Sequence, residues 1–273
     1  MIPAAFTYRK AATVEEALGL LAEHGDDAKL LAGGHSLLPL MKLRLAVPEV
    51  LVDVGGITAL SHITDDGERV RIGALTRHHD VATSELLTAE IPLLAHAAGT
   101  IGDPQIRHRG TVGGSVAHGD PASDLPAVLL ALDAVFVLQG PSGTREVAAT
   151  EFFTDFFETA LGEDELLIEI AVAKTRGQGW DFQKFTRRAI DWAMVGVAVA
   201  GDRVALINMA STPVRARGVE EALAGGASAA EAAERAADGT SPPDEPGASA
   251  EYRRHLAKVL TRRALEAATT RAT

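Results

Sequence analysis

Two glycine pairs constrain the fold of this chain more than any other feature. They stand at Gly33-Gly34 and at Gly113-Gly114, and each lies where an apolar, strand-like run meets polar residues. Glycine permits positive φ and the close approach of another group to the backbone. Successive backbone N–H groups in such turns form concavities that hold anions. One such loop is weak evidence, but two in one domain suggest a clasp for a ligand with two phosphates.

Composition sets the class of protein. The 273 residues predict one large or two medium domains, and 47% of them are hydrophobic, which is enough for a substantial core. The formal net charge of -11 argues against a general nucleic-acid binder, because phosphate neutralisation needs a basic surface. A small anionic ligand held by backbone amides remains compatible with this charge.

The chain contains no cysteine. This excludes disulfides, thiolate zinc sites, a cysteine nucleophile and cysteine-bound iron–sulfur clusters from it. Residues 1–12 lack the apolar core of a signal peptide, and no apolar run is long enough to span a bilayer. We therefore expect a cytoplasmic protein without a membrane span. His78 and His79 would point to different faces of a helix, so we expect no metal site there.

Local signals give the order of helices and strands. Thr13 and Glu16 form a capping box for the first helix, and Gly201-Asp202 joins two apolar runs in the clearest hairpin. We expect helices at about 13–24, 92–99, 124–132, 214–223, 229–237 and 249–268. We expect strands at about 29–32, 50–54, 70–72, 135–138, 166–172, 195–200 and 203–209. Because the two kinds mix without a regular βαβ period, the expected fold class is α+β.

A change of composition near residue 176 predicts two domains, at 1–176 and 177–273. Ser36 follows the first glycine pair as a candidate cap of a second helix. Asp124 is a candidate cap of a later helix, with Pro126 in its first turn.

The flanks of the second glycine pair favour a binding role. Arg107, His108 and Arg109 precede it, and residues 118–121 follow it. An extended polar loop in a largely apolar chain is often functional. The arginines are equally compatible with ordinary surface charge, and each glycine pair alone with an ordinary strand-to-helix turn.

Three further residues have both a structural and a functional interpretation. Asp124 is usually just a helix cap, but its carboxylate could accept a hydrogen bond from a ligand. Lys184 in a strand is normally solvated, and Trp192 is normally in the core. An aromatic ring near a positive charge also suits a planar, electron-rich ligand.

Taken in order, four segments resemble the FAD-binding medium subunits of the molybdenum hydroxylases, the xanthine dehydrogenase family, and most closely its aerobic carbon monoxide dehydrogenase branch. The segments are Ala32-Gly33-Gly34-His35-Ser36-Leu37-Leu38-Pro39, Thr111-Val112-Gly113-Gly114-Ser115, Asp120-Pro121-Ala122-Ser123-Asp124-Leu125-Pro126 and Ser211-Thr212-Pro213-Val214-Arg215-Ala216-Arg217. The similarity covers nearly the whole chain, and the combination is far more specific than any one segment.

The resemblance implies a two-lobed FAD-binding fold of the vanillyl-alcohol oxidase and p-cresol methylhydroxylase type. Its lobes would lie at about 1–55 and 56–176, and a small antiparallel sheet with helices would follow. FAD is the implied cofactor. The residues implied to bind it are Lys29, Leu30, Leu31, Ala32, Gly33, Gly34, His35, Ser36, Ile101, Thr111, Val112, Gly113, Gly114, Ser115, Asp124, Leu167, Lys184 and Trp192.

The resemblance also implies a place for each of these residues. The segments 29–36 and 111–115 would wrap the pyrophosphate, and Asp124 would bind a polar group of FAD. Ile101 and Lys184 would lie near the flavin, and Leu167 would pack on the adenine side. Trp192 would replace a tyrosine beside the isoalloxazine. Ser115 departs from the usual asparagine or aspartate.

As a member of this family, the chain would not oxidise the substrate itself and would hold no catalytic residue. A large molybdopterin subunit would do so, and a small subunit with two [2Fe–2S] clusters would pass the electrons to FAD here, in a dimer of heterotrimers. The lack of cysteine agrees with clusters on another chain.

Two alternatives remain open. One is a self-sufficient flavin oxidoreductase of the same fold, acting on a small alcohol, amine or heterocycle. The other is a non-catalytic binding protein that has lost its flavin. The sequence leaves open the substrate (carbon monoxide, a purine, a heterocycle or an aldehyde) and the final acceptor (quinone, NAD or oxygen).

Overall fold

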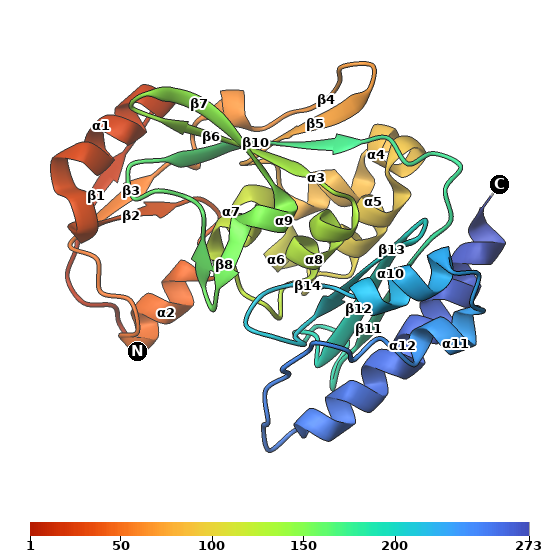
Figure 1. The fold of residues 1–273 in the computed structure, drawn as a ribbon. Coiled ribbons are helices and arrows are strands. Elements are labelled where there is room, and N and C mark those ends of the chain that lie inside the picture. Colours follow the sequence, from red (N-terminus) through yellow and green to blue (C-terminus); the bar gives the residue numbers. More distant parts are fainter. Residues whose placement is uncertain (273) are drawn as a thin grey trace.

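Sheets of three, five and four strands organise residues 1–272, which the computed structural model describes. Figure 1 shows a central group of helices between the five-stranded and the four-stranded sheet, with the three-stranded sheet beside them at the N-terminal end. Parallel and antiparallel pairings both occur, and helices gather against the sheets in blocks. The expected α+β class is confirmed.

The N-terminal sheet is parallel, in the order β1-β3-β2. Its elements are β1 (Thr7–Lys10), α1 (Val14–His24), a 3-10 turn (Gly25–Asp27), β2 (Ala28–Leu31), α2 (Leu37–Leu43) and β3 (Val50–Asp53). The Thr13 side chain accepts the Glu16 amide, and the Glu16 carboxylate accepts the Ala12 amide. The Thr13 cap of α1 forms as expected, but the capping box is incomplete, because the Glu16 carboxylate accepts the amide of Ala12 and not that of Thr13. The first glycine pair lies between β2 and α2.

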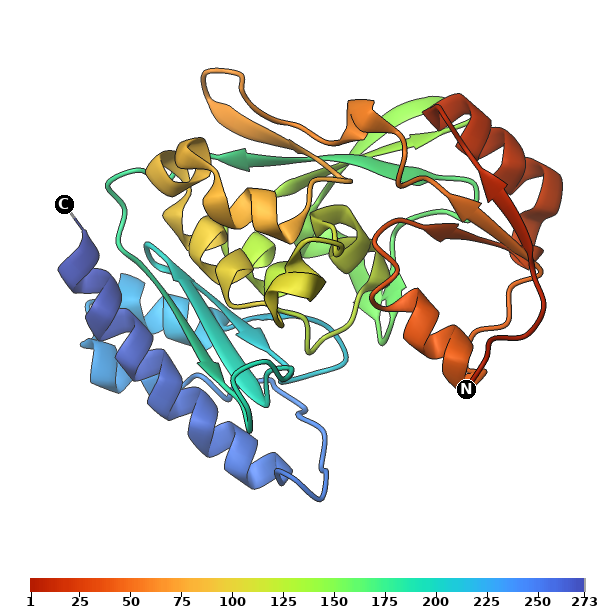
Figure 2. The same ribbon diagram turned by 180° about the vertical axis from the view of Figure 1, so that it is seen from behind.

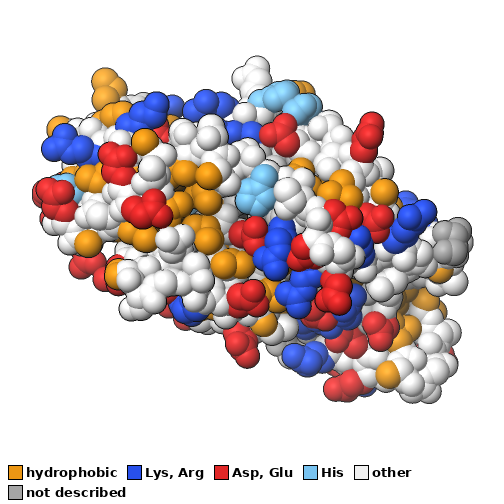
Figure 3. Space-filling view, turned by 90° about the horizontal axis from the view of Figure 1, so that it is seen from above, with side chains coloured by type: hydrophobic (Ala, Val, Ile, Leu, Met, Phe, Trp, Pro, Cys, Tyr) orange, Lys and Arg blue, Asp and Glu red, His pale blue; other side chains and the backbone are white. Residues whose placement is uncertain are grey.

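The five-stranded sheet is antiparallel, in the order β4-β5-β10-β6-β7. A 3-10 turn (Thr58–Leu60) precedes it, and its strands are β4 (Ile63–Asp65), β5 (Arg69–Gly73), β6 (Val135–Gly140), β7 (Gly143–Ala148) and β10 (Leu166–Ala173). Arg71, on β5, pairs with Asp66 and with Glu169. Figure 3, which looks down on this side of the molecule, shows cationic and anionic side chains close together. One face of the sheet is thus solvated, as antiparallel sheets allow.

Helices cover the other face of this sheet. They are α3 (His78–Thr83), α4 (Glu85–Glu90), α5 (Pro92–Gly99), α6 (Pro104–Arg107), α7 (Val112–His118), α8 (Asp124–Ala131) and α9 (Ala149–Phe152), followed by the hairpin β8 (Phe153–Asp155) and β9 (Glu158–Thr159). Every residue of α8 is buried. A helix that is apolar all round belongs in a core, and α8 packs between the five-stranded sheet region and the C-terminal sheet.

The C-terminal sheet is antiparallel, in the order β11-β12-β13-β14. Its elements are β11 (Trp180–Phe185), β12 (Val195–Ala200), β13 (Arg203–Ile207), β14 (Val214–Arg215), α10 (Arg217–Ala224), α11 (Ala229–Ala233) and α12 (Ala250–Arg271). Strand alternation gives β12 two buried faces: Ala198 joins the central core, whereas Val197 joins the core under α12. Figure 2 shows α12 lying across the outer face of this sheet. None of the helices described in residues 1–272 could cross a membrane.

Several local expectations were wrong. The second glycine pair lies inside the first turn of α7 rather than in a loop, and neither of its glycines has positive φ. Ser123, not Asp124, occupies the cap position of α8. The segment expected as a helix from residue 214 begins as the edge strand β14, because Val214 pairs with Leu206. The domain boundary near residue 176 stays a prediction.

Gly113 allows α7 to lie directly against the strand end at Ala74. A Cβ at this glycine would stand 2.5 Å from the Ala74 Cβ and 2.6 Å from the Ala74 carbonyl oxygen. We predict that Gly113→Ala lowers the free energy of unfolding by about 1–3 kcal/mol, the usual cost of overpacking. Gly19→Ala, in α1 with open space around it, should instead raise it by about 0.5–1 kcal/mol. Urea unfolding measures both, and equal effects would contradict this packing role.

Candidate functional site

A cleft of about 670 Å³ opens between the N-terminal sheet and the helices under the five-stranded sheet. Much of its lining comes from the end of β2 with the first glycine pair, the start of α7, the β8–β9 hairpin with the start of β10, and the loop after β11, and other elements add single residues. All of the residues expected to bind the ligand line this cleft except Val112. Val112 is fully buried in the central core, because its side chain points into the helix packing rather than toward the cleft.

The first glycine segment has the properties of an anion-binding turn. Gly34 has a φ of 77°. Within the described chain, the amides of Gly33, Gly34, His35 and Ser36 donate to no protein acceptor. Ser36 precedes α2, but its side chain makes no capping hydrogen bond, so its hydroxyl is also free for a ligand. Successive unpaired amides of this kind form a concave site for an anion.

The second glycine segment is built differently. The Val112 amide donates to the Thr76 carbonyl at 3.0 Å, and the Gly113 amide donates to the Ala74 carbonyl at 2.9 Å. The Gly114 amide donates to the Thr111 hydroxyl at 3.1 Å. These amides are therefore already paired in the described chain and form no row of free donors, so the contact of this segment with a pyrophosphate stays a prediction. Any contact it makes with a ligand would come from other groups, such as the Ser115 hydroxyl.

The glycines of the first segment also allow two backbones to meet. A Cβ on Gly33 would stand 2.4 Å from the Arg109 carbonyl oxygen and 2.8 Å from the Gly110 Cα. The loop before α7 therefore packs directly on the loop after β2. This contact brings the two glycine segments to the same end of the cleft.

Asp124 and Lys184 form a buried ion pair in the wall of the cleft. The Lys184 Nζ donates to Asp124 Oδ2 at 2.7 Å, and the side chains are only 10% and 5% exposed for the lysine and the aspartate. Burial raises the pKa of Asp124, and the Lys184 ammonium opposes this shift. Asp124 Oδ1 has no hydrogen-bond partner in the described chain. Because an unpaired buried acceptor is costly, this oxygen fits a ligand that brings an N–H or O–H group.

Trp192 lies at the cleft rather than in the core. Its side chain is 58% exposed, and Ile190 beside it is 55% exposed. The loop that carries both is fixed at its end, because Asn208 Nδ2 donates to the Ala193 carbonyl at 2.9 Å. Arg253 donates to the next carbonyl, of Met194. The exposed indole is thus held near the mouth of the cleft from the C-terminal sheet and α12.

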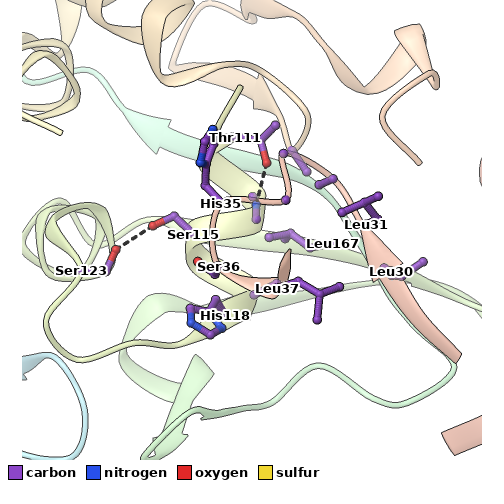
Figure 4. A pocket seen from close by; sticks show the side chains of 18 of the residues that line it. Leu30, Leu31, His35, Ser36, Leu37, Thr111, Ser115, His118, Ser123 and Leu167 are labelled. Atoms are coloured by element: carbon purple, nitrogen blue, oxygen red, sulfur yellow. Dashed lines mark hydrogen bonds between the residues drawn. The ribbon is translucent and has the colours of Figure 1, made fainter. Parts of the chain in front are cut away.

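Sequence reasoning missed several lining residues. Figure 4 shows His118 at the cleft, as well as the hydrogen bond between Ser115 and Ser123. The His118 ring lies 4.9 Å from that of Phe157, which has a φ of 57°. The polar flank of the second glycine pair already pointed to His118. No local pattern could have indicated Phe157, because only the β8–β9 hairpin brings it to this cleft.

His78 is a second buried polar group that the sequence did not assign. It lines the cleft, and its Nδ1 has no partner among the described residues. Burial, helped by the nearby charges of His35, Arg77 and Arg107, lowers the pKa of His78 to about 4. The imidazole is therefore neutral at physiological pH. The neighbouring His79 turns away and stacks on His108 at 3.9 Å between ring centroids.

Two protein families match consecutive parts of the chain. The family described as the FAD binding domain in molybdopterin dehydrogenase matches residues 4–174. The family described as the CO dehydrogenase flavoprotein C-terminal domain matches residues 180–268. The resemblance inferred from the glycine pairs and the Asp-Leu-Pro segment is confirmed.

Individual proteins are similar over their whole length. The carbon monoxide dehydrogenase medium chain of Hydrogenophaga pseudoflava is 45% identical over 282 residues, with 98% of each chain covered. The glyceraldehyde dehydrogenase medium chain of Sulfolobus acidocaldarius is 37% identical, with 97% of this chain and 99% of that protein covered. A solved structure of the Hydrogenophaga pseudoflava carbon monoxide dehydrogenase, lacking the Mo-pyranopterin moiety, has a TM-score of 0.96 at 44% identity and full coverage of both chains.

The neutral His78 predicts a loss of stability in acid. Its folded-state pKa of about 4 lies below the ordinary 6.5, so only the unfolded chain takes up a proton between these values. The contribution of the neutral His78 to the free energy of unfolding is fully present above about pH 6.5 and is lost as the pH drops toward 4. We expect His78→Gln to reduce the difference in unfolding free energy between pH 7 and pH 4.5 by about 2–3 kcal/mol.

Urea unfolding at both pH values measures this difference. His255→Gln, on the exposed face of α12, is the matched control and should leave the difference unchanged. If both variants keep the wild-type pH dependence, His78 does not carry the effect.

Proposed function

The chain belongs to the FAD-binding medium subunits of the molybdopterin dehydrogenases, and we propose that it is the electron-transfer subunit of such an enzyme, of the carbon monoxide dehydrogenase type. One observation supports this most directly. The loop after β2 presents successive unpaired amides to a cleft that is large enough for a dinucleotide, in a chain whose net charge is -11. Backbone amides can hold a pyrophosphate without any basic surface.

The residues present fit FAD along the whole cleft. The amides of Gly33 to Ser36 would hold the pyrophosphate. The free Oδ1 of Asp124 would accept a hydrogen bond from a polar group of the cofactor. Leu167 offers apolar surface to the adenine, and Trp192 and Lys184 would lie beside the isoalloxazine, as the family implies.

FAD supplies the redox chemistry when bound, because it can accept electrons from one partner and release them to another. This chain would orient the cofactor, neutralise its phosphates and keep Lys184 close to it. Iron–sulfur clusters would lie on another chain, since no cysteine is present here. We therefore propose a complex with a large molybdopterin subunit and a small [2Fe–2S] subunit, as a cytoplasmic dimer of heterotrimers.

Carbon monoxide is the substrate that we propose for the complex. The greater identity to a carbon monoxide dehydrogenase chain than to a glyceraldehyde dehydrogenase chain supports this choice. The residues that select the substrate would belong to the large subunit.

Purification of the native complex tests the proposed function. We expect two further subunits to co-purify with this chain, one FAD per chain, and bleaching of the flavin absorption band when carbon monoxide is added without an external acceptor. Bleaching by glyceraldehyde instead would keep the electron-transfer role and overturn the substrate. A chain that takes up no FAD, as isolated or after reconstitution, would overturn the role itself.

The free amides after β2 predict a specific effect of Gly34. Gly34→Ala forces an alanine to a φ of 77° and should displace these amides, so we expect FAD affinity to fall about tenfold, equivalent to about 1.4 kcal/mol. Gly67→Ala is a matched control. It carries similar backbone strain at a φ of 103°, in a hairpin tip with open space around it. Fluorescence titration of the flavin-free variants with FAD measures both, and equal affinities would contradict the assignment.

A further inference from the structure

A second cavity, of about 230 Å³, lies next to the first glycine segment. It shares only Leu31, Ala32 and Gly33 with the large cleft. Its other lining residues are Lys10, Leu38, Asp53, Gly55, Gly56, Arg77 and Arg109. The segment that would hold the pyrophosphate is therefore also a wall of a separate, smaller cavity.

Three cations converge on this second cavity from three parts of the chain. Lys10 ends β1, Arg77 precedes α3, and Arg109 precedes α7. In the described chain, none of the three has a nitrogen within 4.0 Å of a carboxylate oxygen. The lining thus carries three positive charges without an ion-pair partner.

Asp53 is the one carboxylate in the lining, and each of its two oxygens already accepts a hydrogen bond from within the chain. Its Oδ1 accepts the Gly55 amide at 2.8 Å, and its Oδ2 accepts the Tyr8 hydroxyl. Asp53 therefore lowers the local charge but does not pair directly with a cation. Three cations and one carboxylate leave a net charge of +2 in the lining.

Lys10 and Arg109 are exposed, so the lack of an ion-pair partner is most informative for Arg77, which is partly buried. Acidic residues number 37 and basic residues 26, so carboxylates are in excess. Elsewhere the well-buried arginines are paired: Arg215 with Asp133 and Glu220, and Arg253 with Glu245. Arg77 is half-buried without such a partner, and burial together with the charge of Arg109 lowers its pKa. The like charges of Arg77 and Arg109 repel each other. An anion between them would relieve the repulsion.

We propose that Lys10, Arg77 and Arg109 bind an oxyanion of phosphate size in this second cavity, separately from FAD. Guanidinium groups bind phosphate through their planar fork, and an ammonium contributes a point charge. The Gly56 amide lines the cavity and donates to no acceptor in the described chain, so it can add a hydrogen bond to the anion. The volume accommodates a single phosphate group, either free or at the end of a nucleotide.

The backbone around the site is held in place independently of a ligand. Arg77 Nη1 donates to the Arg109 carbonyl oxygen, the same atom against which Gly33 packs. Arg77 thus makes one structural hydrogen bond, and the other N–H groups of its guanidinium have no partner in the described chain. Lys10 and Arg109 make no side-chain hydrogen bond in the described chain, so substitutions of these two side chains test binding with the least disturbance of the fold.

Calorimetric titration of the FAD-saturated complex with inorganic phosphate tests the proposal. FAD saturation, checked by absorbance, prevents phosphate from occupying the cleft. We expect saturable binding with a Kd of about 1 mM or lower in low salt. Lys10→Gln and Arg109→Gln should each weaken it about tenfold, the size of one charge-assisted contact. Lys42→Gln, an exposed α2 lysine outside both cavities, should leave the Kd unchanged.

Each further outcome has a defined meaning. Tighter binding of AMP than of inorganic phosphate would identify a nucleotide as the source of the group, and equal or weaker binding would identify a free oxyanion. No saturable binding up to about 10 mM, or equal affinity in all variants, would overturn the site. Loss of FAD from Lys10→Gln and Arg109→Gln, with phosphate binding unchanged, would assign the cations to the cofactor and also overturn it. Phosphate binding that is weakened by Lys10→Gln and Arg109→Gln in a chain that takes up no FAD would contradict the proposed function alone.

Discussion

The contact between two backbones at Gly33 sets the geometry of the whole functional region. Any side chain there would place its Cβ 2.4 Å from the Arg109 carbonyl oxygen, so the loop after β2 and the loop before α7 meet only because this residue is glycine. The large cleft lies along one part of this junction and the second cavity along another. The distance between the loop after β2 and the start of α7, and hence the width of the cleft, depends on it.

The two glycine pairs look alike in sequence but differ in how their backbone amides are hydrogen-bonded. After β2 the chain leaves the parallel sheet, and no neighbouring strand or turn pairs with the amides from Gly33 to Ser36. At the second pair, Val112 and Gly113 donate to carbonyls near the end of β5, which anchors α7 to the sheet. Both pairs allow close packing, at Gly33 and at Gly113, but only the first would also offer unpaired backbone amides to an anion. An isolated sequence motif cannot distinguish these roles, because the acceptor atoms belong to a distant strand.

Much of the candidate site could be predicted, because the residues of the family motifs lie in short continuous segments. Local signals placed α1, α5, α8 and the β12–β13 hairpin close to their observed positions. Val112 is buried in the core and does not line the cleft, because a motif contains core residues as well as exposed ones, and its contact with a ligand stays a prediction. Trp192 was expected in the core on general grounds, yet only the resemblance placed it at the cleft, where Asn208 and Arg253 hold its loop. His78 and Phe157 reach the cleft from elements that carry no such motif.

The sequence by itself determined the family, and through the family the cofactor class and the partner chains, because the motifs occur in the family's order; the absence of cysteine agrees with this. Tertiary structure decided which polar groups remain free. The buried Asp124–Lys184 pair joins α8 to β11, and the unpaired cluster of Lys10, Arg77 and Arg109 joins three separate segments. Whether a charge or an amide is satisfied depends on neighbours far away in the chain. That property exists only after the backbone has folded, which is why the second cavity has no signature in the sequence.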